Sequence, residues 1–163
     1  HSSIHKARPD AACVMHCHPP YPLALCMIED GRLEFADQNA CRFYEKIAYD
    51  DEYGGGALDN DEGSRIANAL GNNDVLFMAN HGVTVAGANV AHAWEQLYFL
   101  DRACQAQVLA MSTGRPLKKI PEHTVRSVAK EIETAESGVT ASYHRHFAAL
   151  KRLLEPEQPN YRC

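Results

Sequence analysis

The sequence predicts a layered α/β domain, because short apolar runs typical of buried strands alternate with longer segments that keep helical spacing. A chain of 163 residues, 45% of them hydrophobic, is long enough for one such domain to bury its own core. We expect this domain over residues 1–154 and an extended tail over 155–163. The expected strands and the longest expected helix cover residues 12–17, 75–79, 83–86 and 89–111.

The first third of the chain predicts a strand, a turn and a short helix. Residues 12–17 are apolar enough for a buried strand, and the turn-forming run His18-Pro19-Pro20-Tyr21 separates them from a helix over 22–28. A further short strand is expected over 33–36. The acidic, glycine-rich stretch 50–61 is typical of a mobile loop.

The middle of the chain predicts a helix followed by two strands joined by a polar turn. Asn60 or Asp61 is a suitable cap for a helix that ends at Leu70, before Gly71-Asn72. The strands 75–79 and 83–86 follow, with Asn80-His81-Gly82 between them. Two β segments joined in this way usually pair as neighbours or form a sharp bend.

The second half of the chain is predicted to be helical. Apolar side chains recur at i, i+3 and i+4 from 89 to 111, and Gly114 and Pro116 end this helix. Two weaker helical patterns follow over 124–137 and 141–154.

Composition and charge exclude several classes of function. The net charge is −5 and the sixteen Lys and Arg residues are scattered, so we expect no nucleic-acid partner. No apolar run approaches the roughly 18–20 residues that span a bilayer, and no signal peptide is evident. The six cysteines form no C-x-x-C pair, which favours reduced thiols and a cytoplasmic protein. The first residue is His rather than Met, so we expect part of the protein to lie upstream.

A pair of alternating histidines is the strongest chemical signal. His16 and His18 lie on one face of the predicted strand, with Cβ atoms about 7 Å apart, while Cys17 points to the other face. Two imidazoles at this spacing can converge on one metal ion. His81 is the best third ligand, because Gly82 beside it removes side-chain bulk and lets the backbone turn sharply.

Other histidines are poorer candidates. A single histidine is more often a surface or core residue than a ligand, and His92, His123, His144 and His146 fall on predicted helices or linkers, where we expect them to be solvated. Three protein ligands leave open positions on an ion, which is typical of a catalytic rather than a structural metal. Histidine ligands suit zinc, iron and manganese alike.

Two sequence blocks resemble the class II aldolase/adducin family. The block Arg8-Pro9-Asp10 to His18, followed by Pro20-Tyr21, is similar to the family's R-P-D-x-V-x-H-x-H motif. The block Leu76 to Val83 resembles its L-x-x-N-H-G motif, and the helix 93–111 is similar to the family's segment that follows. The similarity keeps order and spacing from His1 to about Gly114.

The resemblance implies a three-layer α/β/α domain, a C4 tetramer with the active site near a subunit interface, and a small-molecule substrate. It places the family's metal ligands on His16, His18 and His81, with zinc as the usual ion. It also implies that the family's catalytic Glu, and most residues that hold a sugar phosphate, lie ahead of His1. The catalytic residue of this chain is therefore unknown. The stretch 49–62 is closer to adducin and its bacterial relatives than to the sugar-phosphate aldolases.

Several further residues have both a functional and a structural interpretation. Tyr21 is a possible proton donor, although packing at the turn is favoured. Acidic residues near the loop are possible substitute bases, but a solvated loop is the simpler account. The Gly54-Gly55-Gly56 run lacks the spacing of a phosphate-binding loop. Arg8 and Asp10 are expected to fix the turn before the first strand, and Trp94 to be core or interface. The acidic residues concerned are Glu45, Asp50, Asp51 and Glu52.

The leading functional hypothesis is a metal-dependent lyase of the class II aldolase type that acts on a small hydroxy-carbonyl compound. A decarboxylase or oxygenase on the same scaffold is the second hypothesis, and a redox-active iron or manganese would favour it. The third is a non-catalytic, adducin-like interaction domain, against which the three intact histidines argue.

Overall fold

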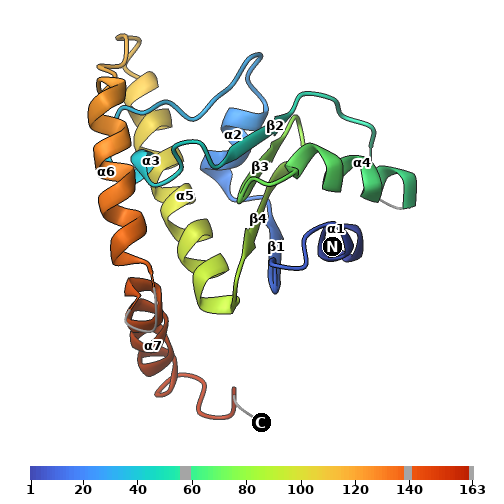
Figure 1. Ribbon diagram of the computed structural model, residues 1–163. Coiled ribbons are helices and arrows are strands. Elements are labelled where there is room, and N and C mark those ends of the chain that lie inside the picture. Colours follow the sequence, from blue (N-terminus) through green and yellow to red (C-terminus); the bar gives the residue numbers. More distant parts are fainter. Residues whose placement is uncertain (56–59, 138–140, 162–163) are drawn as a thin grey trace.

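A four-stranded sheet forms the centre of the computed structural model, which describes residues 1–55, 60–137 and 141–161 (Figure 1). The strand order is β1-β4-β3-β2, in which β4 runs antiparallel to both of its neighbours and β2 pairs parallel with β3. β1, β2 and β3 therefore run in one direction, and their carboxyl ends lie at the same edge of the sheet. The strands are β1 (Cys13–Cys17), β2 (Ile47–Asp50), β3 (Val75–Met78) and β4 (Gly82–Gly87).

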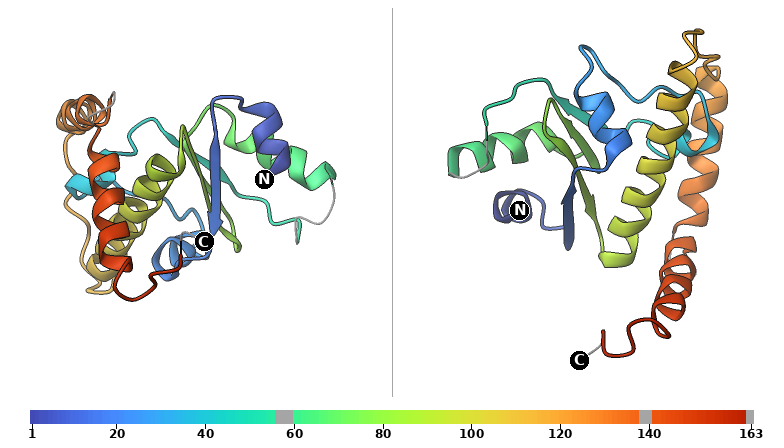
Figure 2. Two further views of the ribbon diagram at one scale, coloured as in Figure 1. Left: turned by 90° about the horizontal axis from the view of Figure 1, so that it is seen from below. Right: turned by 180° about the vertical axis from the view of Figure 1, so that it is seen from behind.

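Helices cover both faces of the sheet, as the two views in Figure 2 show. Helices α1 (Ser2–Ala7) and α4 (Asn60–Leu70) pack together on one face, and α2 (Pro20–Cys26) and α5 (Val90–Met111) on the other. This arrangement confirms the three-layer α/β/α domain. Three more helices lie outside α5: α3 (Gln38–Cys41), α6 (Glu122–Ala135) and α7 (Ser142–Leu154).

The sheet separates two apolar cores. Strands β3 and β4 are buried along their whole length, which explains why both read as nearly continuous apolar runs rather than alternating ones. β1 alternates: Val14 belongs to the core beneath α1 and α4, whereas Met15 packs against the larger core beneath α2 and α5. The larger core includes Phe43 and Leu100, which are almost completely buried.

The predicted helices are present, with small shifts at their ends. The Asn89 side chain accepts a hydrogen bond from the backbone N–H of His92 at 2.9 Å and so caps α5. α4 begins at Asn60, so the position that would cap it lies outside the described residues. Residues 51–55 of the predicted loop are irregular, and the part over 56–59 is not described.

Two expectations about secondary structure are wrong. Residues 33–36 form no strand, because the backbone N–H of Glu34 donates to the Gln107 side chain and that of Leu33 to the Tyr49 hydroxyl, instead of to a neighbouring strand. The described part of the tail is folded into turns rather than extended, with the N–H of Gln158 bonded to the carbonyl of Leu154 at 2.8 Å.

Three short elements were not predicted. α1, α3 and β2 contain four to six residues each, too few for a helical or alternating pattern to stand out. Within the described residues, β2 is an edge strand that pairs only with β3. α3 is capped by Asp37, whose side chain accepts a hydrogen bond from the backbone N–H of Asn39 at 2.6 Å.

Arg8 ties the start of β1 to the end of α4. Its guanidinium binds Asp10 at 2.7 Å, as the sequence predicts, and also donates to the backbone carbonyls of Gly71 and Asn73 at 3.0 and 2.8 Å. The hydrogen bonds to Asp10 raise the pKa of Arg8. The side chain therefore fixes two elements that are more than sixty residues apart in sequence.

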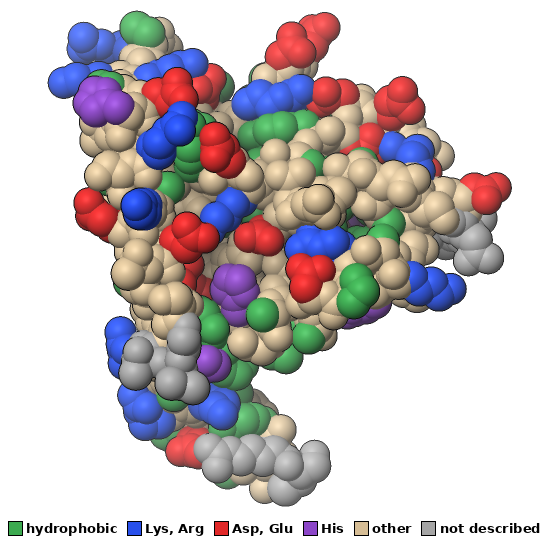
Figure 3. Space-filling view, in the orientation of Figure 1, with side chains coloured by type: hydrophobic (Ala, Val, Ile, Leu, Met, Phe, Trp, Pro, Cys, Tyr) green, Lys and Arg blue, Asp and Glu red, His purple; other side chains and the backbone are tan. Residues whose placement is uncertain are grey.

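Charged side chains are intermixed on the surface. On the face drawn in Figure 3, acidic and basic groups alternate over α6 and over the loops above the sheet. Among the described residues, no helix is both long enough and apolar enough to cross a bilayer.

We predict that Leu100→Ala lowers the free energy of unfolding by about 2–5 kcal/mol, because it leaves a cavity in the larger core. Leu109→Ala on the same helix is the matched control. Leu109 is 56% exposed, so its replacement should change stability by no more than about 0.5 kcal/mol. Urea denaturation followed by circular dichroism measures both, and equal losses would contradict the assigned packing of α5.

Candidate metal centre

The three histidines singled out from the sequence lie together at the edge of the sheet where β1 and β3 end. His16 and His18 come from β1 and the residue after it, and His81 from the turn between β3 and β4. Their ring centroids are 4.8, 4.8 and 5.0 Å apart. One ring nitrogen from each residue lies within 4.8 Å of the other two. The structure therefore brings these side chains together as the sequence predicts.

The orientation of His16 is set by the neighbouring strand. Its Nδ1 lies 3.0 Å from the carbonyl oxygen of Val83, so this nitrogen carries the proton and donates to β4. Nε2 is then left with a lone pair, and it faces Nε2 of His18 at 2.9 Å. A ring N–H bonded to a backbone carbonyl is the usual outer support of a metal-binding histidine.

The chemistry of this donor set fits a divalent ion. Two imidazole nitrogens 2.9 Å apart need a proton or a cation between them, and the third ring completes one side of a coordination shell. Burial lowers the pKa of His16, and the neighbouring His81 and His18 lower it further. Burial and the nearby His18 also lower the pKa of His81. Both shifts favour the neutral ring, which is the form that binds metal.

Gly82 permits the close approach of the two strands. A Cβ atom on this residue would lie 2.5 Å from Cδ2 of His18 and 2.7 Å from the carbonyl oxygen of Cys17. The turn before it is held by hydrogen bonds from the N–H of Asn80 to the carbonyl of Cys26 and from the N–H of His81 to that of Met78. Asn80 adopts a φ of +56°, which Asn tolerates better than most residues.

Cys17 lies on the opposite face of β1 from the two histidines, as predicted. It packs against the core beneath α2 and α5. It is therefore outside the histidine cluster.

Arg65 organises the acidic residues next to the cluster. Its guanidinium contacts both carboxylate oxygens of Asp50 at 2.6 and 2.7 Å and both of Glu62 at 2.8 and 2.7 Å. These hydrogen bonds, chiefly the two to Glu62, raise the pKa of Arg65. Asp50 is buried at the end of β2 and Glu62 lies in the first turn of α4. Arg65 thereby joins the end of β2 to the first turn of α4.

Tyr53 is a neighbour of the cluster that no pattern in the sequence singles out. Its ring centroid lies 6.2 Å from that of His81, and the side chain is 57% exposed. Tyr21, the possible proton donor, instead accepts a hydrogen bond from Gln105 of α5 at 3.0 Å. The structural interpretation of Tyr21 therefore holds. Of the acidic candidates, Asp51 is paired with Arg32 at 2.7 Å.

Two of the other histidines depart from their expected solvated state. His92 of α5 is half-buried: its Nδ1 accepts a hydrogen bond from the backbone N–H of Ala88 at 3.3 Å, and its ring packs against Tyr143 with the centroids 5.0 Å apart. His146 of α7 contacts the carboxylate of Glu95, which is buried on α5. The sequence could not place the two together because they are 51 residues apart. Trp94, on the same helix as Glu95, is partly exposed.

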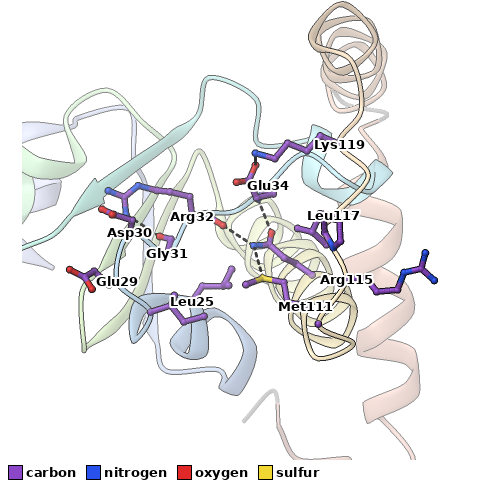
Figure 4. A pocket seen from close by; sticks show the side chains of 14 residues that line it. Leu25, Glu29, Asp30, Gly31, Arg32, Glu34, Met111, Arg115, Leu117 and Lys119 are labelled. Carbon is purple, nitrogen blue, oxygen red and sulfur yellow. Dashed lines mark hydrogen bonds and ion pairs between the residues drawn. The ribbon is translucent and has the colours of Figure 1, made fainter.

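A pocket away from the histidines lies on the side of the sheet that α2 and α5 cover (Figure 4). It measures about 660 Å³ and lies between the loop after α2 and the end of α5. None of the three histidines lines it, and several of its charged groups are already engaged: Lys119 pairs with Glu34, and Arg32 with Asp51. Arg115 points away from the cavity in the close view. The histidine cluster is therefore the better candidate for the chemistry.

The chain is similar to proteins that are already known. The family model of the Class II Aldolase and Adducin N-terminal domain matches residues 1–108. Decarboxylase NovR of Streptomyces niveus is 32% identical over 165 residues, which cover 98% of this chain and 60% of that protein.

Two solved structures share the fold. The aldolase II superfamily protein from Pseudomonas syringae superposes with a TM-score of 0.89 and 35% identity, over 100% of this chain and 64% of that one. L-fuculose 1-phosphate aldolase from Glaciozyma antarctica PI12 gives a TM-score of 0.76 and 26% identity, over 98% and 57% of the two chains. The chain thus spans less than two thirds of the length of each of these three relatives.

We predict that Gly82→Ala weakens Zn²⁺ binding by at least about tenfold, because the new methyl group displaces His18 from its neighbours. Competition with a chromophoric chelator measures the affinity. Gly114→Ala is the control, since Gly114 also has a positive φ but a Cβ atom added there would meet no other atom within 4 Å. Unchanged affinity in Gly82→Ala would argue against His18 as a ligand.

We also predict that Arg65→Met lowers the free energy of unfolding by about 3 kcal/mol, because buried Asp50 loses its charged partner. Arg126→Met is the matched control, since the Arg126–Glu122 pair lies on the exposed face of α6 and should contribute little. Thermal and urea denaturation compare the two variants. A similar, small effect of both would show that Asp50 does not depend on Arg65.

Proposed function

The chain belongs to the class II aldolase and adducin family, and on that premise we propose that it is a metal-dependent lyase acting on a small hydroxy-carbonyl compound. The observation that carries the proposal is the convergence of His16, His18 and His81, with ring nitrogens within 4.8 Å of one another. We propose these three residues as the ligands of a divalent ion, with zinc as the first choice and iron or manganese as alternatives.

The proposed ligands come from β1, the residue after it and the turn before β4, and three protein ligands leave at least one position on the ion open to substrate. When bound, a divalent ion polarises a substrate carbonyl and stabilises negative charge on its oxygen. The protein supports this chemistry through its own groups. Val83 fixes the tautomer of His16, and Tyr53 stands beside His81, where it can contact a bound molecule.

The nearby carboxylates are poorly suited to act as the general base. Asp50 and Glu62 are both held by Arg65, and Asp51 by Arg32. For Glu62 the pKa is lowered, chiefly by its hydrogen bonds to Arg65, which makes this carboxylate a weaker base. We therefore propose that the acid/base group comes from a segment ahead of residue 1.

We also propose that the protein forms a tetramer in the cytoplasm.

A decarboxylase is the second candidate function. The similarity to Decarboxylase NovR supports it, because that similarity extends over nearly the whole chain. Both reactions leave negative charge next to a carbonyl carbon, so the same three ligands would serve either one. An oxygenase would need a redox-active ion in the same place.

We predict that the purified protein carries about one transition-metal ion per chain, as a site with three histidine ligands would. Inductively coupled plasma mass spectrometry identifies and counts the ion. The double variant His16→Ala, His81→Ala should lose it, whereas His123→Ala, His144→Ala, which replaces two exposed histidines, should keep it. Retention of more than half of the ion in the first variant would refute the site. A stable protein with no transition metal would favour an adducin-like interaction domain.

The reaction type can be tested with the same protein. A panel of hydroxy-carbonyl and keto-acid compounds is incubated with the metal-loaded protein, and released aldehyde and released carbon dioxide are measured in parallel. A lyase of the aldolase type yields the aldehyde, and a decarboxylase yields carbon dioxide. Neither product should form with His16→Ala, His81→Ala.

A further inference from the structure

A second, smaller cavity adjoins the histidine cluster. It measures about 80 Å³ and lies between the sheet and helices α1 and α4. His16 and His81 form part of its wall. Most of the remaining wall is hydrocarbon, contributed by Ile4, Val14, Ile66 and Met78. The cavity therefore shares two of its lining side chains with the histidine cluster.

The lining of the cavity selects against polar groups. Ile4, Val14 and Met78 are buried, and the Thr84 hydroxyl, which also lines the cavity, lies 3.4 Å from Nδ1 of His16. The last lining residue is His1. A hydroxyl or phosphate group placed among the aliphatic side chains would lose its water without gaining partners.

The volume sets the size of the group that fits. An apolar protein cavity of about 150 Å³ holds one benzene molecule of six carbons. By the same ratio, a cavity of about 80 Å³ accommodates roughly three carbons.

We propose that the substrate carries an aliphatic group of about three carbons next to the oxygens that the histidine site holds, and that this group occupies the cavity. The proposal rests on the proposed function, since it takes the histidines as the metal site. It narrows the substrate class from hydroxy-carbonyl compounds in general to those with a short hydrocarbon substituent. A polyhydroxylated chain would place hydroxyl groups against Ile66 and Met78.

Unbranched alkyl hydroxamates are suitable probes, because their two oxygens chelate a metal while the alkyl chain leaves from the carbonyl carbon. The intact protein is loaded with Co²⁺, and each hydroxamate from acetohydroxamate to octanohydroxamate is titrated while the visible absorption of the ion is followed. The dissociation constant should fall about fourfold for each of the first two added methylenes, which bring the substituent to three carbons, and then level off. Equal affinity along the series would overturn the proposal.

Ile66→Phe tests whether the chain-length dependence comes from this cavity. The larger side chain should abolish the gain from added methylenes and leave the affinity for acetohydroxamate within about twofold. Leu109→Phe is the control, because it adds the same ring at an exposed position on α5. If circular dichroism shows that Ile66→Phe is unfolded, Val14→Ile replaces it and should shorten the optimal chain by one carbon.

The possible failures are distinguishable. If the dissociation constant of Ile66→Phe or Val14→Ile still depends on chain length as in the unaltered protein, the alkyl group does not bind in this cavity. Absence of Co²⁺ binding, or binding that survives His16→Ala, His81→Ala, would instead remove the proposed function before any hydroxamate is added.

Discussion

The pairing of β1 with β4 is the constraint on which the candidate site depends. The register places His16 opposite Thr84 and Cys17 opposite Val83, and it brings the Val83 carbonyl to Nδ1 of His16. Side chains along a strand alternate between faces, so a slip of one residue would turn His16 and His18 toward α2 and α5 and place Cys17 near His81. The register therefore decides which ligand atoms meet.

Three other features hold that register. β4 has neighbours on both sides and is buried along its length, so any slip would move its apolar side chains relative to both cores. Arg8 fixes the entry to β1 by binding the carbonyls of Gly71 and Asn73. The turn before Gly82 also fixes the register, because β3 and β4 are paired up to the contact of Met78 with Gly82. The site is thus the product of long-range packing, not of a local motif alone.

The sequence predicts structure correctly where the pattern is local, as in alternating residues of a strand, or extends over many residues, as in a long helix. Alternation predicts that His16 and His18 share a face, and the 22-residue α5 has enough turns for its apolar spacing to be evident. The prediction of a strand at 33–36 is wrong because the backbone N–H of Glu34 donates its hydrogen bond to the side chain of Gln107, more than seventy residues away. No local pattern encodes such a contact.

The same limit applies around the candidate site. The glycine next to His81 and the family resemblance predict His81 as a metal ligand. Its distance from His16 and His18, however, depends on the fold. The positions of Tyr53 beside His81 and of Arg65 beside Asp50 depend on how β2 and α4 pack in the fold. A short edge strand such as β2 gives too little periodicity to predict that placement.

The attachment of α4 has a consequence for how such a protein can diversify. Arg65 secures the beginning of the helix and Arg8 the backbone just beyond its end, whereas Ile66 on the helix lines the small cavity. The three histidines come from the sheet and its turn, and none of them is on α4. Exchanges at Ile66 can therefore alter the shape offered to a ligand while the ionic anchors and the histidines stay in place. Under selection, recognition and reactivity would be free to change at separate positions.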